Sequence, residues 1–247
     1  MEKSGRDVLS GHARRRGSDP PGRLRAGLVR LGHVYAAHRY AVLFYTLLLT
    51  LGAAPLLAAL HFRADLLQIF LAFSLLVAVL DVSGDRWRMV LIVLASVVVG
   101  LRVAPVSTVG AELANGALFV GSILALLATA SAVRFAVRTQ AINAEQIYAA
   151  LSAYLLAGLF FGVLHWAIAI AWPGSLAEAG ATGTPASIPL STAIYYSFVT
   201  LATLGYGDVI PRTDVARGLA VLEAVGGQLY IAVTIARLVG SQLPMRP

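Results

Sequence analysis

Long stretches of apolar residues dominate this sequence from position 41 to position 240, and they constrain its fold more than any other feature. A helix needs roughly 20 such residues to cross about 30 Å of hydrocarbon. The composition agrees, because only 13% of the residues are charged, whereas a soluble domain averages about a quarter. The sequence therefore predicts an all-α membrane protein with six transmembrane helices, expected at 41–60, 66–80, 89–106, 113–133, 147–172 and 214–240.

Two segments of the first half do not read as ordinary transmembrane helices. The 66–80 stretch is short and lies between Asp65 and Asp81, so crossing would require a thinner bilayer or snorkelling flanks. Residues 1–39 are polar and basic, which predicts a disordered cytoplasmic N-terminus. Its arginine run, 14–16, either binds anionic lipid or a partner or acts as a topology signal, and we favour the topology signal.

Basic residues also predict orientation. With six crossings, all but four of the 19 Lys and Arg residues fall on the side of the N-terminus. This positive-inside bias places both termini in the cytoplasm and the segment between the last two spans outside. The net charge of +7 is thus explained by topology, and no nucleic-acid partner is expected. The chain has no cysteine, which excludes disulfides and thiolate chemistry.

The segment between the last two spans is unusual. Residues 174–189 are polar and rich in small side chains, and residues 190–204 are apolar but too short to cross, which favours a re-entrant segment. Backbone at membrane depth is tolerated only against protein or a water-filled cavity. Ser191 is the expected N-cap of a helix ending near Ala202, about half a bilayer long. Its negative end would point to mid-membrane, where a cation is least solvated, and this predicts a pore.

Directly after this helix comes the sequence T-L-A-T-L-G-Y-G-D, residues 200–208. Gly205 and Gly207 flank Tyr206, and glycine permits backbone angles that are closed to other residues. Such an alternation can aim successive carbonyl oxygens along one line, and oxygen ligands suit hard cations. Tyr195 and Tyr196 either pack around this segment or belong to a plain core.

These residues resemble the selectivity filter of potassium channels. The family signature T-x-x-T-x-G-Y-G-D is matched by Thr200, Thr203, Gly205, Tyr206, Gly207 and Asp208. The resemblance covers about residues 144–240 and implies a pore domain of outer helix, turret, pore helix, filter and inner helix. It resembles the six-span bacterial type of this family.

The resemblance also implies function. It implies passive conduction of K+ by carbonyls of Thr203, Leu204, Gly205 and Tyr206, with the Thr203 hydroxyl as the innermost ligand. Thr200, Gly207 and Asp208 would support the filter. One filter segment per chain implies a homotetramer in a lipid bilayer, with K+ as permeant ion and no cofactor.

Two positions depart from the commonest family pattern. Leu204 replaces Val or Ile, and Ala202 replaces a frequent Thr. A weakly selective cation channel and a nonconducting subunit with a vestigial filter therefore stay open as alternatives. Tyr206 favours K+ selectivity, because related nonselective pores often carry Asp at that place.

The last span holds four further candidate residues. Gly226 and Gly227 either form a gating hinge like that of the family or allow close helix packing, and we favour the hinge. Glu223 either concentrates cations or is a hydrogen-bonded strut behind the filter, and we favour the strut. Gln228 begins a stripe, with Ile231 and Ile235, that could line an inner cavity.

The remaining regions predict little specialised chemistry. Residues 40–138 stand where a voltage sensor would, but the 113–133 span contains no arginine, so strong voltage gating is not expected. Residues 241–247 form a short cytoplasmic tail, and no catalytic motif appears, so the chain is not expected to be an enzyme. His165 is interpreted as a packed or interfacial residue. The strong excess of Arg over Lys is typical of a GC-rich, bacterial genome. The expected location is therefore the plasma membrane, that is, the bacterial inner membrane.

Overall fold

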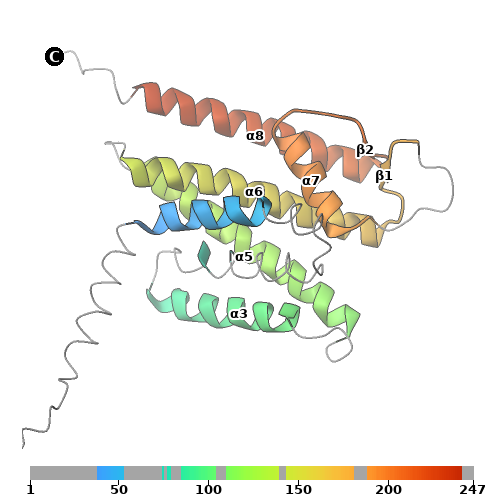
Figure 1. Ribbon diagram of the computed structural model, residues 1–247, viewed down its shortest axis with the longest axis horizontal. Coiled ribbons are helices and arrows are strands. Elements are labelled where there is room, and N and C mark those ends of the chain that lie inside the picture. The colour runs from blue at the N-terminus through green and yellow to red at the C-terminus, as the bar shows by residue number, and fades with distance from the viewer. Residues whose placement is uncertain are drawn as a thin grey trace, which may run out of the picture. The chain divides into compact units, whose positions relative to one another are not determined.

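The computed structural model describes residues 38–52, 74, 77–78, 85–103, 110–138, 143–180 and 188–240. The described elements are a helix at 38–52, α3 Asp85–Val103, α5 Ala111–Arg138, α6 Ala144–Ala171, β1 Leu176–Glu178, α7 Leu190–Leu201, β2 Val209–Pro211 and α8 Asp214–Gly240 (Figure 1). The predicted N-terminal segment up to residue 37, nearly all of the 66–80 span and the 241–247 tail lie outside the described residues.

The mostly helical fold confirms the predicted class, and three of the described helices are long and apolar enough to cross a membrane. These are Phe119–Ala136 within α5, Ala144–Ala171 (α6) and Asp214–Gly240 (α8). In α3 the apolar stretch covers only Met89–Leu101, which is short of the roughly 20 residues that a crossing needs. The other predicted spans therefore stay predictions.

Element boundaries differ slightly from those expected. Helix α6 begins at Ala144, three residues before the predicted start at 147, because Asn143 and Gln146 form a capping box. The side chain of Asn143 accepts from the Gln146 amide at 3.1 Å, and that of Gln146 accepts from the Asn143 amide at 2.9 Å. The prediction of Ser191 as N-cap is wrong, because α7 already starts at Leu190 and its N-cap is Pro189, whose backbone is extended.

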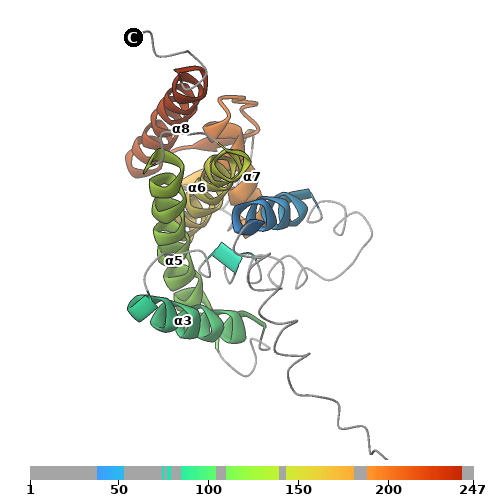
Figure 2. The ribbon, with the colours of Figure 1, turned by 90° about the vertical axis from the view of Figure 1, so that its left-hand side faces the viewer.

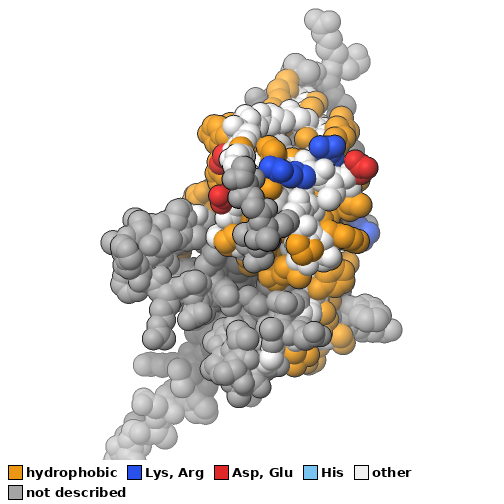
Figure 3. Space-filling view, turned by 90° about the vertical axis from the view of Figure 1, so that its right-hand side faces the viewer, with side chains coloured by type: hydrophobic (Ala, Val, Ile, Leu, Met, Phe, Trp, Pro, Cys, Tyr) orange, Lys and Arg blue, Asp and Glu red, His pale blue; other side chains and the backbone are white. Residues whose placement is uncertain are grey.

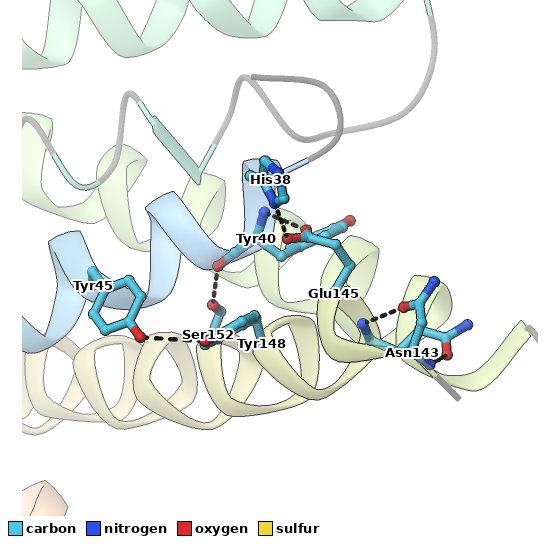
Figure 4. Close-up of polar contacts among 8 residues, drawn as sticks. His38, Tyr40, Tyr45, Asn143, Glu145, Tyr148 and Ser152 are labelled. Carbon is cyan, nitrogen blue, oxygen red and sulfur yellow. Dashed lines mark hydrogen bonds and ion pairs between the residues drawn. The ribbon is translucent and has the colours of Figure 1, made fainter. Parts of the chain in front are cut away.

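Helix α6 lies at the centre of the described structure, in contact with α5, α7 and α8 (Figures 1 and 2). The 38–52 helix is tied to it by hydrogen bonds that Figure 4 shows. The Tyr40 amide donates to Glu145 at 3.1 Å, and the hydroxyls of Tyr45 and Tyr148 lie 3.2 Å apart. The 38–52 helix thus packs on α6, the outer helix of the predicted pore domain.

Two glycines bring α6 and α7 into close contact. A Cβ atom on Gly162 would lie 2.8 Å from the Cα of Ile194, and one on Gly158 would lie 2.6 Å from the ring of Phe198. The two glycines are four residues apart, so they share one face of α6, as in the small-residue interfaces of membrane helices. Because α7 carries the filter segment at its end, this contact fixes the distance of that segment from α6.

The polar segment before α7 contains a strand that the sequence analysis missed. Strand β1 pairs antiparallel with β2, with Ala177 opposite Ile210. Further backbone bonds extend the connection, from the Ala179 amide to the Asp208 carbonyl at 2.7 Å and from the Arg212 amide to the Ser175 carbonyl at 2.8 Å. Figure 3 views the molecule from the side of this ribbon, where charged side chains gather.

Candidate functional site

The candidate filter begins at the residue where α7 ends. Ala202 is the C-cap, and the amides of the next two residues fold back on the helix. The Thr203 amide donates to the Thr200 carbonyl at 3.0 Å, and the Leu204 amide donates to the Val199 carbonyl at 2.9 Å. This pair of bonds is a Schellman motif, which requires a left-handed residue at the first position after the cap.

Thr203 occupies that left-handed position, with φ of 57°. Left-handed backbone costs a residue with a side chain about 1–2 kcal/mol, and glycine is the usual choice there. Threonine therefore occupies this position against its backbone preference.

Positive φ angles then recur at every second residue. Gly205 has φ of 59° and Gly207 has φ of 77°, whereas Leu204 and Tyr206 between them have no such angle. This is the alternation that the sequence analysis expected from the glycines, and it now includes Thr203. A backbone that alternates between left-handed and other angles can turn successive carbonyl groups toward one side of the segment.

This segment is exposed on the surface of the single chain. Every residue from 202 to 208 is exposed, including Leu204 at 55% and Tyr206 at 67%. The inner helix next to it is also uncovered, because only 11% of α8 is buried, against 44% of α6. In the described part of the chain, the filter segment and much of α8 thus stand uncovered.

Asp208 ties the outer end of the segment to α7 and to the ribbon. One carboxylate oxygen accepts from the Tyr195 hydroxyl at 2.7 Å, and the other accepts from the Val209 amide at 3.0 Å. Tyr196, by contrast, is buried and packs its ring edge to face on His165, with centroids 4.9 Å apart. Tyr195 therefore contacts the filter segment, whereas Tyr196 belongs to the core.

Behind α7, one polar side chain from each of three helices meets in a fully buried cluster, the His165–Ser197–Glu223 triad. His165 Nε2 on α6 lies 2.8 Å from Glu223 Oε2 on α8, and Ser197 on α7 hydrogen-bonds the other carboxyl oxygen. Ser197 Oγ also lies 2.7 Å from the Gly158 carbonyl oxygen of α6. All three side chains are 0% exposed.

The two glycines of α8 differ in their surroundings. A Cβ on Gly227 would meet Leu201 of α7, 2.7 Å from Cδ1 and 3.1 Å from the carbonyl oxygen. Gly226 has open space and borders an apolar cavity of about 360 Å³ between α5, α6 and α8. Gln228 is exposed. Helix α8 runs through the doublet without a break.

Sequence reasoning found the filter segment but missed residues that hold it. Ser197 and the α6 glycines were not singled out, and His165 was not paired with Glu223. The available signal was one ionisable residue inside each of two apolar helices, His165 in α6 and Glu223 in α8. Such residues in membranes tend to pair with one another.

Comparison with known proteins defines the class to which this fold and site belong. Residues 149–241 match a family model described as "Ion channel", which covers most of α6 and all of α7, the filter segment and α8. The chain thus carries an ion channel domain in its second half. No solved structure matches the chain.

A sequence match to one known protein indicates the kind of ion channel. The chain is 32% identical over 94 residues to "Two pore potassium channel c" of Oryza sativa subsp. japonica. The alignment covers 38% of this chain and 19% of the rice protein. Together, the family match and this relative support a potassium channel family for this membrane protein.

Proposed function

We propose that this protein is a potassium-selective channel that conducts K+ passively across a membrane. The observation that carries the proposal is the filter segment itself, where positive φ recurs at Thr203, Gly205 and Gly207 directly after a helix of 12 residues. Such a helix is about 18 Å long, close to half the thickness of a bilayer. Its C-terminal end carries a partial negative charge that favours a cation beside it.

The ligands we assign to K+ are backbone oxygens. The carbonyls of Thr203, Leu204, Gly205 and Tyr206, with the Thr203 hydroxyl, replace the hydration shell of the ion. The side chain of Leu204 points away from the ion in this arrangement, so its larger size affects packing behind the filter more than the ligands. Gly207 and Asp208 then hold the outer end, and Asp208 has the contacts described above.

The conducting unit is a homotetramer in this proposal. One chain supplies one row of oxygens, and a ring around an ion requires several rows. The uncovered faces of α8 and of the filter segment are the surfaces that neighbouring copies would bury. On α8 these faces include Leu222, Val225 and Leu229, which are 69%, 53% and 62% exposed. The exposed position of Gln228, and of Ile235 on the same helix, suits a shared inner cavity.

Gating and location complete the proposal. Weak voltage dependence is expected, because the apolar helix α5 carries no arginine between Phe119 and Val133. Close packing of Gly227 against Leu201 supports the packing role of that glycine, and a hinge then acts only if α8 separates from α7. The bacterial inner membrane, with both termini cytoplasmic, is the expected location.

The test is ion flux into liposomes that contain the purified protein. K+ uptake well above Na+ uptake, with block by Ba2+, is the expected result. Equal uptake of the two ions would favour the weakly selective cation channel, and no uptake would favour the nonconducting subunit. Gly205→Ala is the matched variant: its Cβ meets no atom within 4 Å of its own chain, but φ of 59° disfavours alanine, so uptake should fall while folding is kept.

A further inference from the structure

If Glu223 were ionised, the His165–Ser197–Glu223 triad would have too few protons for the hydrogen bonds that its geometry allows. The Ser197 hydroxyl has one proton but lies within hydrogen-bond distance of two oxygen atoms, the Gly158 carbonyl and Glu223 Oε1. A carbonyl cannot donate, so if Ser197 donates to Gly158, the second contact needs a proton from the carboxyl group. A protonated Glu223 supplies it.

The surroundings of His165 decide which of its two ring nitrogens carries the proton. His165 Nδ1 is buried and has no hydrogen-bond partner among the described residues. A proton on Nδ1 would therefore be an unsatisfied buried donor, which costs about 1–3 kcal/mol. The tautomer assigned by this pattern is the neutral ring with its proton on Nε2, which donates to Glu223 Oε2.

An ionised Glu223 would consequently be a buried charge without a counter-ion. Protonating His165 to provide one would place a proton on Nδ1, and Glu223 forms no ion pair with Lys or Arg in the described part of the chain. The other titratable groups that face it are the hydroxyls of Tyr154 on α6 and Tyr196 on α7, which are uncharged at neutral pH. An isolated carboxylate inside a membrane protein is strongly disfavoured.

We propose that Glu223 is an uncharged carboxylic acid that positions the pore helix α7 through a one-way chain of hydrogen bonds. The chain runs from His165 Nε2–H to Glu223 Oε2, from Glu223 Oε1–H to Ser197, and from Ser197 to the Gly158 carbonyl. Each proton has one acceptor, and each helix of the ion channel domain contributes at least one member.

The position of the triad connects it to the filter. Ser197 is two residues before Val199, whose carbonyl accepts from Leu204, and Glu223 is one helical turn before Gly227, which contacts Leu201. A change in the triad therefore shifts α7 against α8 at the point where the filter begins. This link to ion selectivity rests on the proposed function, whereas the protonation state of Glu223 does not.

The protonation state is tested by infrared spectroscopy of the full-length protein in lipid at pH 8, where exposed carboxyl groups are ionised. The difference between wild type and Glu223→Gln should contain the carbonyl band of an un-ionised carboxylic acid. Ser197→Ala should keep this band and shift it upward, because the acid loses its acceptor. A difference spectrum with only carboxylate bands would overturn the proposal, whether or not the protein conducts.

The positioning role is tested by the K+ to Na+ uptake ratio of the same preparations. Glutamine replaces the carbonyl oxygen and the hydroxyl of the neutral acid by one carbonyl oxygen and one NH2 group that can donate to Ser197, so Glu223→Gln should stay within about twofold of wild type. Glu223→Leu leaves His165 Nε2–H without an acceptor and should lower the ratio by roughly tenfold.

Ser122→Ala is the control, since Ser122 is a buried serine whose hydroxyl donates to the Phe119 carbonyl within α5. If the Leu variant fails to fold, Ser197→Ala provides the second comparison and should also lower the ratio. A Gln variant as impaired as the Leu variant would overturn the positioning by a neutral acid. Absence of uptake by the wild type would instead refute the proposed function.

Discussion

Replacing each glycine of the α8 doublet by alanine separates packing from intrinsic helix preference. Both substitutions gain about 1 kcal/mol, because alanine is the better helix former. Only at Gly227 does the new methyl group meet the pore helix, 2.7 Å from Leu201 Cδ1 and 3.1 Å from the Leu201 carbonyl oxygen. Carbon atoms prefer about 3.5–4.0 Å, so one of the two helices must move.

The expected difference between the two variants follows from these contacts. Overpacking of this kind costs about 1–3 kcal/mol. Gly226→Ala should therefore stabilise the protein by about 1 kcal/mol, since nothing lies within 4 Å of its Cβ. Gly227→Ala should range from neutral to about 2 kcal/mol less stable than wild type.

The assay is equilibrium unfolding in mixed micelles with increasing SDS, with helix content as the signal. Gly227→Ala is measured again in a Leu201→Ala variant, which lacks Cδ1. If the two side chains are coupled, Gly227→Ala should cost less stability in that variant than in wild type. Equal stabilities of Gly226→Ala and Gly227→Ala, or a Gly227→Ala variant more stable than wild type, would refute the packing argument.

Three further outcomes are expected. Gly162→Ala should destabilise the protein by about 1–3 kcal/mol in the same unfolding assay, because the backbone of Ile194 cannot move aside as a side chain can; an unchanged midpoint would contradict the close contact of α6 and α7. Tyr195→Phe should lower K+ uptake by removing a hydrogen bond at the outer end of the filter, whereas Asp208→Asn, which keeps an acceptor, should lower it less; the reverse order would show that the charge matters more than the bond. Native mass spectrometry in mild detergent should give four copies, and a monomer that still conducts would exclude the proposed tetramer.

The sequence alone was sufficient for what is contiguous along the chain. The ends of α8 agree with the predicted 214–240 span, and the candidate filter segment is a contiguous run of residues whose prediction needs no knowledge of packing. The backbone alternation was expected from Gly205 and Gly207, and the structure adds the positive φ of Thr203. A helix with a long apolar pattern and a glycine-rich turn can be predicted because local physics determines both.

Contacts between helices could not be predicted in the same way. His165 and Glu223 are separated by 58 residues and Ser197 and Glu223 by 26, and they meet only because three helices have particular rotations about their axes. The β1–β2 ribbon escaped notice because each strand has only three residues, too few to show an alternating pattern. The close approach at Gly162 likewise depends on which face of α6 turns toward α7.

The central claim, selective conduction of K+ through the filter, is tested most directly by the reversal potential of single channels in a planar bilayer. With K+ on one side and Na+ on the other, the proposed carbonyl ligands of residues 203–206 predict a potential displaced strongly in the direction that K+ permeation requires. Ba2+ should block the current. A reversal potential near zero, with a stable single-channel current, would show that both ions pass equally and would contradict the claim.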